Sequence, residues 1–216
     1  MSSTPSDRLP ALPRRFYSGD ARVVAPALLN KVLVAGGRRG RIVEVEAYAG
    51  SEDPGSHAFR GLTKRNAVMF GPPGHLYVYF TYGMHWCANA VCSPPGEATA
   101  VLIRALEPLA GVAEMRLARS RGQRRPLSDR DLCRGPARLC QALGIGGEAD
   151  GADLVSSDRG LRIGDDGFEP PASPVITTRV GLSAGADLPW RFAVPDSVYV
   201  SGRHAAGSGR DVEGDG

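Results

Sequence analysis

The sequence predicts a single α+β domain, in which short strands and a few helices are mixed along the chain. The length of 216 residues fits one domain with a substantial core. Runs of alternating apolar and polar residues, bounded by Gly- and Pro-rich turns, predict strands that pair as hairpins. Apolar residues at helical spacing occur in shorter stretches between them. We find no internal repeat inside this domain.

The two ends of the chain differ in composition from the part between them. Residues 1–13 are polar and contain prolines, which predicts a disordered leader without the apolar centre of a signal peptide. Residues 201–216 are polar and glycine-rich, which predicts a disordered tail. The folded domain is therefore predicted over residues 14–200. No apolar run approaches the ~18 residues that a membrane span needs, so we expect no contact with membranes.

The order of the elements follows from these patterns. Ser18 and Asp20 are candidate N-caps for the first helix, and Pro136 suits the first turn of the last helix. We expect helices over about 21–30, 110–119 and 137–143, strands at 31–35, 41–48, 75–82, 88–91, 99–105, 161–164 and 176–182, and short elements at 190–194 and 197–200.

The strand at 41–48 has an unusual polar face. Its apolar residues alternate with Glu44, Glu46 and Tyr48, so two carboxylates and an aromatic ring share one row. Like charges two residues apart are mildly unfavourable on a strand. One interpretation is a solvated strand face, and the other is a functional row of carboxylates.

The loop at 50–74 is long and carries several polar side chains beside the acidic strand. A loop of this length with little structure of its own is usually functional or disordered. It contains His57, Lys64, Arg65 and Asn66. A single loop histidine is most often a surface residue, and His57 alone does not decide between the two interpretations.

The next strand, at 75–82, is rich in aromatic residues. Tyr77 and Tyr79 share one face, and we expect Phe80 on the other face to belong to the core. Tyr82 precedes Gly83 in a predicted tight turn, where a side chain projects outward.

Arginine supplies nearly all of the positive charge, since Lys31 and Lys64 are the only lysines. Either a GC-rich genome or a phosphate-bearing partner explains this bias. Arg104 lies inside an apolar strand and needs a carboxylate or phosphate partner. A cluster between residues 116 and 138 suggests a polyanion partner, although such runs are often only solvated. Its members are Arg116, Arg119, Arg121, Arg124, Arg125, Arg130, Arg134 and Arg138.

The sequence predicts no metal site and no cofactor. The four cysteines include no Cys-x-x-Cys pair and are expected to be buried thiols. The histidines lack the spacing of metal ligands. A phosphate-binding loop, a dinucleotide fingerprint and a nucleophile elbow are all missing from the sequence.

Four motifs together resemble the alkyladenine (3-methyladenine) DNA glycosylase family. They are Arg-Ile-Val-Glu-Val-Glu-Ala-Tyr, Leu-Tyr-Val-Tyr-Phe-Thr-Tyr-Gly-Met, Leu-Ile-Arg-Ala-Leu-Glu-Pro and Gly-Pro-Ala-Arg-Leu-Cys-Gln-Ala-Leu, in the family's order. The resemblance spans about residues 16–200. It implies one mixed α/β domain around a curved antiparallel sheet. It also implies a metal-free, monofunctional N-glycosylase that removes alkylated purines and, in some members, deaminated ones.

The resemblance also assigns the residues of the active site. The family's general base falls on Glu46, whereas Glu44 matches a position outside the catalytic role. In the base-binding pocket, the stacking aromatics fall on Tyr48 and Tyr79, and the pocket histidine falls on His57. The loop around His57 departs from the forms typical of the family.

Further family positions concern the contact with DNA. The tyrosine that inserts into the duplex corresponds to Tyr82, and the asparagine at the pocket mouth corresponds to Asn89. Arg104 matches an arginine of the DNA-contact surface. Lys64 and Arg65 are candidates for contacts with the DNA backbone, together with Arg104.

These observations predict a monomeric base-excision-repair enzyme that binds double-stranded DNA with damaged purines. We expect it in the bacterial cytoplasm, acting on chromosomal DNA. Two alternatives stay open: an N-glycosidase of RNA or nucleosides that uses the same pocket, and a non-catalytic module that binds lesions. The lesion range and the role of the arginine cluster do not follow from the sequence.

Overall fold

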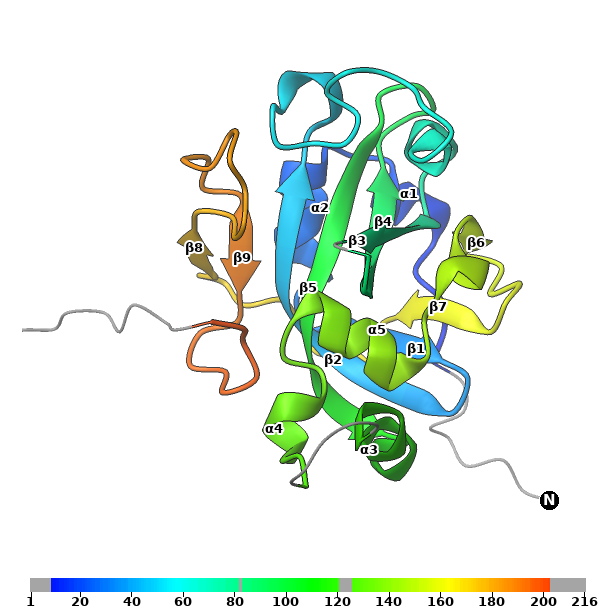
Figure 1. The fold of residues 1–216 in the computed structure, drawn as a ribbon, viewed down its shortest axis with the longest axis vertical. Helices are drawn as coiled ribbons and strands as arrows, with labels where there is room; N and C mark the ends of the chain where they lie inside the picture. The colour runs from blue at the N-terminus through cyan, green and yellow to red at the C-terminus, as the bar shows by residue number, and fades with distance from the viewer. Residues whose placement is uncertain (1–8, 82, 121–125, 203–216) are drawn as a thin grey trace, which may run out of the picture.

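The computed structural model describes residues 9–81, 83–120 and 126–202. It shows one mixed α/β domain built on a large, open antiparallel sheet, as predicted (Figure 1). The strands run in the order β6-β3-β4-β5-β2-β1-β7, and β9 pairs with β2 and carries β8. Their bounds are β1 Val32–Ala35, β2 Arg38–Tyr48, β3 His75–Thr81, β4 His85–Cys92, β5 Thr99–Ala110, β6 Ala152–Asp153, β7 Leu161–Gly164, β8 Val175–Thr177 and β9 Arg191–Ala193.

The two longest strands, β2 and β5, form the middle of the sheet. They pair antiparallel from Arg39 opposite Ala110 to Tyr48 opposite Ala100, with register shifts near residues 39–45. At Gly40 a Cβ atom would lie 2.8 Å from the Cβ of Leu106, so the close approach of the two strands requires glycine there. Strand β2 also pairs with β9 through Glu44–Glu46, so the part of β2 that carries the two glutamates pairs with both β5 and β9.

Helices pack on both faces of the sheet. In the view of Figure 1, α2 lies behind the strands and α5 lies in front of them. Helix α2 begins after Asp20, whose carboxylate accepts the Arg22 N–H. Helix α5 begins at Pro136 and ends at Leu143, and the Gly144 that caps it adopts the left-handed conformation with φ 72°. The helices are α1 Arg14–Tyr17, α2 Ala21–Leu28, α3 Val112–Ser120, α4 Asp129–Leu132 and α5 Pro136–Leu143.

Four predictions of secondary structure and burial differ from the structure. The helix predicted over about 110–119 begins at Val112, because β5 continues to Ala110 beside the extended end of β2. The strand predicted at 176–182 ends at Thr177, and residues 197–200 form no strand. Phe80 is 44% exposed and packs on Trp86, with 4.7 Å between the ring centroids, instead of entering the core.

The ordered fold extends beyond the predicted domain at both ends. Leu12 is buried and its N–H donates to the carbonyl of Ile163, so residues 9–13 are not part of a disordered leader. Ser201 is also buried and bonds the carboxylate of Glu44, which makes it part of the domain rather than of a tail. Residues 1–8 and 203–216 lie outside the described residues.

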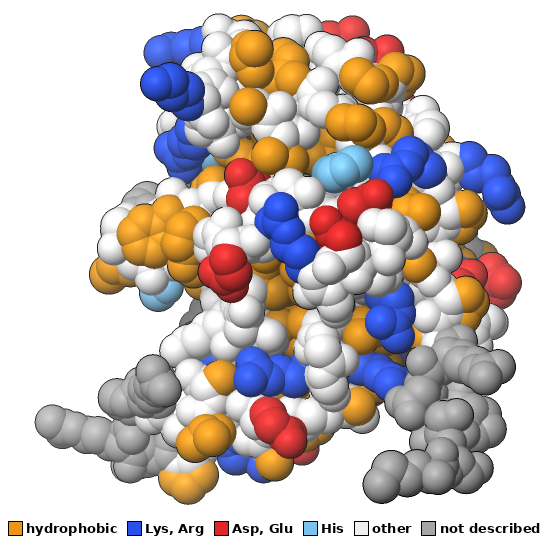
Figure 2. Space-filling view, turned by 90° about the vertical axis from the view of Figure 1, so that its right-hand side faces the viewer, with side chains coloured by type: hydrophobic (Ala, Val, Ile, Leu, Met, Phe, Trp, Pro, Cys, Tyr) orange, Lys and Arg blue, Asp and Glu red, His pale blue; other side chains and the backbone are white. Residues whose placement is uncertain are grey.

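Many charged side chains lie on the surface of the domain, and the cysteines lie inside it. Figure 2 shows basic and acidic side chains interspersed over the side of the molecule that is on the right in Figure 1. The four cysteines are all buried, as predicted. No helix in the described part of the chain is long and apolar enough to cross a membrane.

Candidate active site

Glu46 lies in the middle of the sheet with a fully buried side chain. Its Oε1 accepts the Val180 N–H at 2.7 Å and lies 3.1 Å from Nη1 of Arg104. Its Oε2 accepts the Tyr48 hydroxyl at 3.0 Å. The carboxylate is therefore held by three donors from β2, β5 and the segment after β8, and the interpretation of this strand face as solvated is wrong.

Glu44 supports Glu46 through the same arginine. Its Oε1 lies 2.8 Å from Nε of Arg104 and 2.7 Å from Nε of Arg191, and Ser201 bonds both carboxylate oxygens. Burial by itself would raise the pKa of Glu44, but the charges of Arg104 and Arg191 outweigh it and lower that pKa. Glu44 is thus ionised at neutral pH and fixes the guanidinium that faces Glu46.

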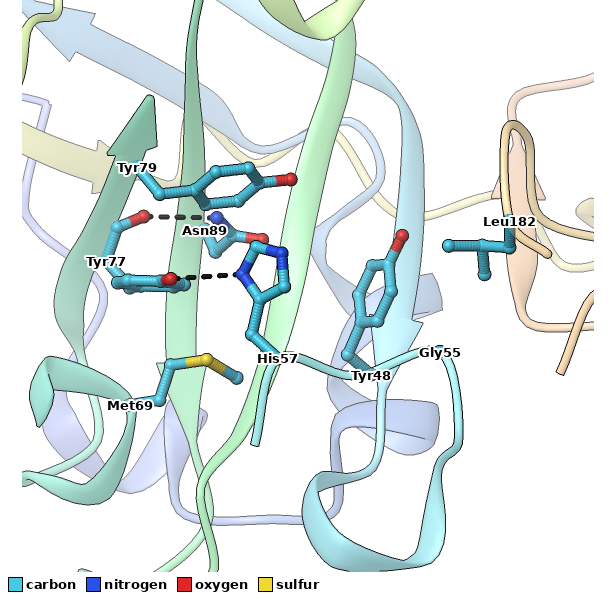
Figure 3. A pocket seen from close by; sticks show the side chains of 8 residues that line it. All are labelled: Tyr48, Gly55, His57, Met69, Tyr77, Tyr79, Asn89 and Leu182. Carbon is cyan, nitrogen blue, oxygen red and sulfur yellow. Dashed lines mark hydrogen bonds between the residues drawn. The ribbon is translucent and has the colours of Figure 1, made fainter. Parts of the chain in front are cut away.

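Aromatic side chains form a pocket beside this carboxylate, shown in Figure 3. His57, Tyr77 and Tyr79 gather on one side of it, and Tyr48 faces them from the end of β2. The His57 and Tyr79 ring centroids are 4.5 Å apart, and the Tyr77 and Tyr79 centroids are 5.4 Å apart. The cavity measures about 340 Å³ including its open mouth. Its lining residues are Tyr48, Gly55, His57, Met69, Tyr77, Tyr79, Asn89 and Leu182.

Hydrogen bonds fix the polar groups of the pocket. The Tyr77 hydroxyl lies 3.0 Å from Nδ1 of His57, and Nδ2 of Asn89 donates to the carbonyl of Tyr77 at 3.1 Å. Burial, together with the nearby charge of Arg65, lowers the pKa of His57, so its imidazole is neutral at pH 7. Burial raises the pKa of Tyr77 to about 12, so its hydroxyl keeps its proton. The pocket thus presents neutral, electron-rich rings to a ligand.

A second, wider cavity continues the pocket toward helix α5. It shares Tyr48, His57, Tyr79 and Leu182 with the pocket and extends to Pro136 and Ala137. All three partners of the Glu46 carboxylate line this outer cavity. Glu46 therefore lies behind the wall of a cavity that leads directly into the aromatic pocket.

The loop that carries His57 is held by a buried asparagine. Asn66 donates from Nδ2 to the carbonyls of His57 and Gly61 at 2.9 and 3.0 Å, and its Oδ1 accepts the Thr63 N–H. Only 1% of Asn66 is exposed. These bonds explain how a loop without long helices or strands keeps His57 against the aromatic strand.

We expect Asn66→Ala to destabilise the fold, because it leaves two carbonyls and one N–H without a partner. The expected loss of unfolding free energy in urea is about 1–3 kcal/mol. Thr63→Ala is the control, since Thr63 is an exposed residue and its hydroxyl contributes only part of this network. An Asn66→Ala protein as stable as Thr63→Ala would contradict this account of the loop.

Comparison with known proteins decides the family. The model of the methylpurine-DNA glycosylase (MPG) family matches residues 15–198. The chain belongs to the methylpurine-DNA glycosylase family. A Burkholderia lata protein named "Putative 3-methyladenine DNA glycosylase" is 61% identical over 201 residues, covering 92% of this chain and 95% of that protein. Proteins of the same name from Leifsonia xyli subsp. xyli and Koribacter versatilis are 52% and 47% identical, over 91% of this chain and 95% of each relative.

Membership in the methylpurine-DNA glycosylase family makes the chain an enzyme of DNA repair, and DNA is its macromolecular partner. The resemblance found in the sequence motifs is confirmed, since the family match spans all four of them. The structure brings Glu46, Tyr48, His57, Tyr79 and Asn89 together around one continuous cavity.

The candidate DNA-contact residues of this glycosylase differ from one another in exposure and in the groups that they contact. Lys64 is exposed. Arg65 is also exposed, but it lies over the Tyr79 ring and donates to the carbonyl of Phe80 at 3.2 Å. Arg104 is 7% exposed and its guanidinium is directed at Glu44 and Glu46, so carboxylates and not phosphates are its partners here. Tyr82 lies outside the described residues.

The described members of the arginine cluster bond other parts of the domain. Arg116 pairs with Asp129, and Arg119 donates to the carbonyl of Leu132 and to Gln141. Arg130 and Arg134 donate to the carbonyls of residues 198, 200 and 202. Arg130 and Arg134 thus hold the C-terminal segment against the glycosylase domain. Arg121, Arg124 and Arg125 lie outside the described residues, and a polyanion contact by the cluster stays a prediction.

Sequence reasoning missed several residues of the site. Arg191 and Val180 contact the two glutamates from segments far along the chain, and Met69 and Leu182 line the pocket. None of them carries a local pattern that distinguishes it from an ordinary strand or loop residue. The unusual acidic row was the one signal, because two buried carboxylates require cationic partners from elsewhere in the chain.

Proposed function

We propose that this glycosylase flips alkylated purines, and also deaminated ones such as hypoxanthine, out of duplex DNA and hydrolyses their N-glycosidic bond. The observation that supports this proposal is the position of Glu46, an oriented carboxylate behind the wall of a cavity that opens into an aromatic pocket. Glu46 serves as the general base, and water is the nucleophile.

The pocket suits a flipped purine. Tyr48 stacks on one face of the base, and His57 with Tyr79 contacts the other face. Stacking is worth about 1–3 kcal/mol per base and tolerates several base identities. An alkylated purine carries positive charge, which the electron-rich rings attract and the neutral His57 does not oppose. Asn89 lies in the wall, where its amide screens the exocyclic groups of the purine.

Tyr82 offsets the cost of flipping by inserting into the vacated stack, as apolar side chains do in other kinked duplexes. Residues on either side of it in the sequence, Thr81 and His85, line the outer cavity.

The chemistry requires one carboxylate. The glycosidic bond breaks through an oxocarbenium-like sugar. A carboxylate has about four acceptor positions, and the three donors leave one for a water molecule. Glu46 deprotonates this water as it attacks C1′ and stabilises the cationic sugar. Lys64 lines neither cavity, which supports a monofunctional enzyme without a Schiff-base step. We also propose that the enzyme acts as a monomer.

Chromatography of the products tests the substrate class. The protein is incubated with methylated duplex DNA, with RNA methylated in the same way, and with free 7-methylguanosine. We expect free methylated purines from the DNA only. Release from RNA or from the nucleoside at a similar rate would support an N-glycosidase that does not need a duplex, and tight lesion binding without any release would support a binding module.

We expect Lys64→Ala to weaken binding to damaged and undamaged duplexes by the same factor, because a phosphate contact carries no sequence information. The slope of log Kd against log salt concentration should fall by about one, which is the change expected when one phosphate contact is lost. Fluorescence anisotropy over a salt series measures this slope, with Lys31→Ala as a control because Lys31 is buried in an ion pair with Asp165. An unchanged slope for Lys64→Ala would show that Lys64 does not contact phosphate.

A further inference from the structure

A buried ion pair between Asp53 and Arg179 lies next to the cavity walls. Both side chains are fully buried. Nη1 of Arg179 is 2.5 Å from Oδ2 of Asp53, and Nη2 is 2.7 Å from Oδ1. This two-pronged geometry is the strongest form of an arginine–carboxylate contact. Neither residue belongs to the aromatic pocket or to the lining of the outer cavity.

The pair connects three segments that each supply residues to the site. Arg179 also donates to the carbonyl of Ala47 at 3.0 Å, next to Tyr48, and to the carbonyl of Gly185 at 3.1 Å. Asp53 accepts the Gly55 N–H at 2.9 Å, two residues before His57. The end of β2, the His57 loop and the segment 179–185 therefore meet at one buried contact.

The same guanidinium contacts the ring of Tyr48. Its Cζ lies 4.7 Å from the centroid of Tyr48 and 5.0 Å from the centroid of Trp190. Such cation–π contacts restrain a ring most when they are shielded from water. Because the Tyr48 hydroxyl donates to Glu46, a restrained ring also restrains one of the three donors to the carboxylate.

The segment that follows Arg179 supplies another donor. Residues 179–184 form no helix or strand, and the hydrogen bonds that hold them in the described structure come from the Arg179 side chain and the Val180 N–H. Arg179 is 4% exposed, whereas Val180 is 51% exposed. At Gly55 a Cβ atom would lie 2.9 Å from both Arg179 Nη2 and Leu182 Cδ1, so this segment packs tightly on the His57 loop.

We propose that Asp53 and Arg179 are positioning residues for bond cleavage, which hold the Val180 N–H and the Tyr48 hydroxyl on Glu46. This inference rests on the proposed function, in which Glu46 is the general base. Without the pair, the exposed segment 180–184 loses its anchor, and the carboxylate loses two of its three fixed donors. Lesion DNA still binds, but the bond breaks slowly.

Val180→Pro tests the inference at the donor itself, because proline removes the N–H that Glu46 accepts. Val180→Ala keeps this N–H and is the matched control. We expect Val180→Pro to lower the single-turnover rate on a lesion duplex by about 10- to 100-fold, with little change in the Kd for that duplex.

Arg179→Lys tests the ion pair with Asp53 itself. The control is Lys31→Met, because this substitution also removes a buried cation, and Lys31 lines neither cavity. Each protein is assayed at the same interval below its own Tm, which separates positioning from stability. We expect a loss of about tenfold or more in single-turnover rate for Arg179→Lys and a near wild-type rate for Lys31→Met.

Two results would overturn the inference while the proposed function stands: equal rates for Val180→Pro and Val180→Ala, or equal losses for Arg179→Lys and Lys31→Met. A wild-type protein that releases no base from any lesion would overturn the proposed function and this inference together.

Discussion

Replacing Glu46 by glutamine is expected to lower the single-turnover rate of base release by at least about 10²-fold, because general-base catalysis contributes about 10²–10⁴-fold. Glutamine has nearly the same shape, and its amide oxygen can still accept the Val180 N–H while its NH2 group donates to the Tyr48 hydroxyl oxygen, but it cannot take a proton from water. The Kd for a lesion duplex should change little, since Glu46 lies behind the cavity wall. Rates are measured with enzyme in excess over a hypoxanthine-containing duplex.

Glu44→Gln tests whether the rate depends on Glu46 as the general base or only on the buried ion-pair network that Glu44 shares with it through Arg104. Glu44 bonds Arg104, Arg191 and Ser201 and does not contact the cavity. Its loss should lower the rate less than the loss of Glu46. If Glu46→Gln turned over as fast as the wild type, the general base would have been assigned to the wrong residue.

Replacing Arg104 by methionine is expected to destabilise the fold by about 3–5 kcal/mol, because it leaves two buried carboxylates without their shared cation. Methionine keeps most of the apolar stem, so the loss reports on charge more than on packing. Urea unfolding at pH 7 measures it. Arg116→Met is the control, since the Arg116–Asp129 pair is solvent-exposed and worth at most about 1 kcal/mol.

The same variant changes the response to acid. The pKa of Glu44 is lowered in the folded protein, so its ionised form stabilises the fold above the ordinary carboxyl pKa of about 4.3, and this stabilisation is lost as the pH falls through the lower folded value. Without Arg104 one cause of the lowering disappears, and acid unfolding should begin at higher pH. A stability and an acid midpoint equal to those of Arg116→Met would contradict the role given to Arg104.

Local patterns were sufficient for much of the sheet. The strand at Leu161–Gly164 has the predicted bounds, and the helix that begins after Asp20 ends two residues earlier than predicted. Period-2 alternation also placed Glu44, Glu46 and Tyr48 correctly in one row of β2. These features depend on neighbours in the sequence, which is why they can be predicted from it.

The surroundings of that row could not be predicted in the same way. Whether it faces solvent depends on Arg104 from β5 and Arg191 from β9, which reach Glu44 only after the sheet has formed. The predicted strand at 176–182 failed for a related reason. Its second half is bound by a buried arginine side chain and not by a β ladder, and Asp53, the partner of this arginine, lies in a distant loop.

We propose that this glycosylase removes a damaged purine by hydrolysis and leaves the sugar–phosphate strand intact. The most direct test is a defined duplex with one hypoxanthine and a labelled strand, incubated with wild-type protein and divided into samples with and without hot alkali. We predict free hypoxanthine, a full-length strand before alkali, and cleavage at the lesion position after it. Cleavage without alkali would contradict the monofunctional mechanism, and an alkali-resistant strand with no released base, from this duplex and from methylated DNA alike, would contradict the proposed function.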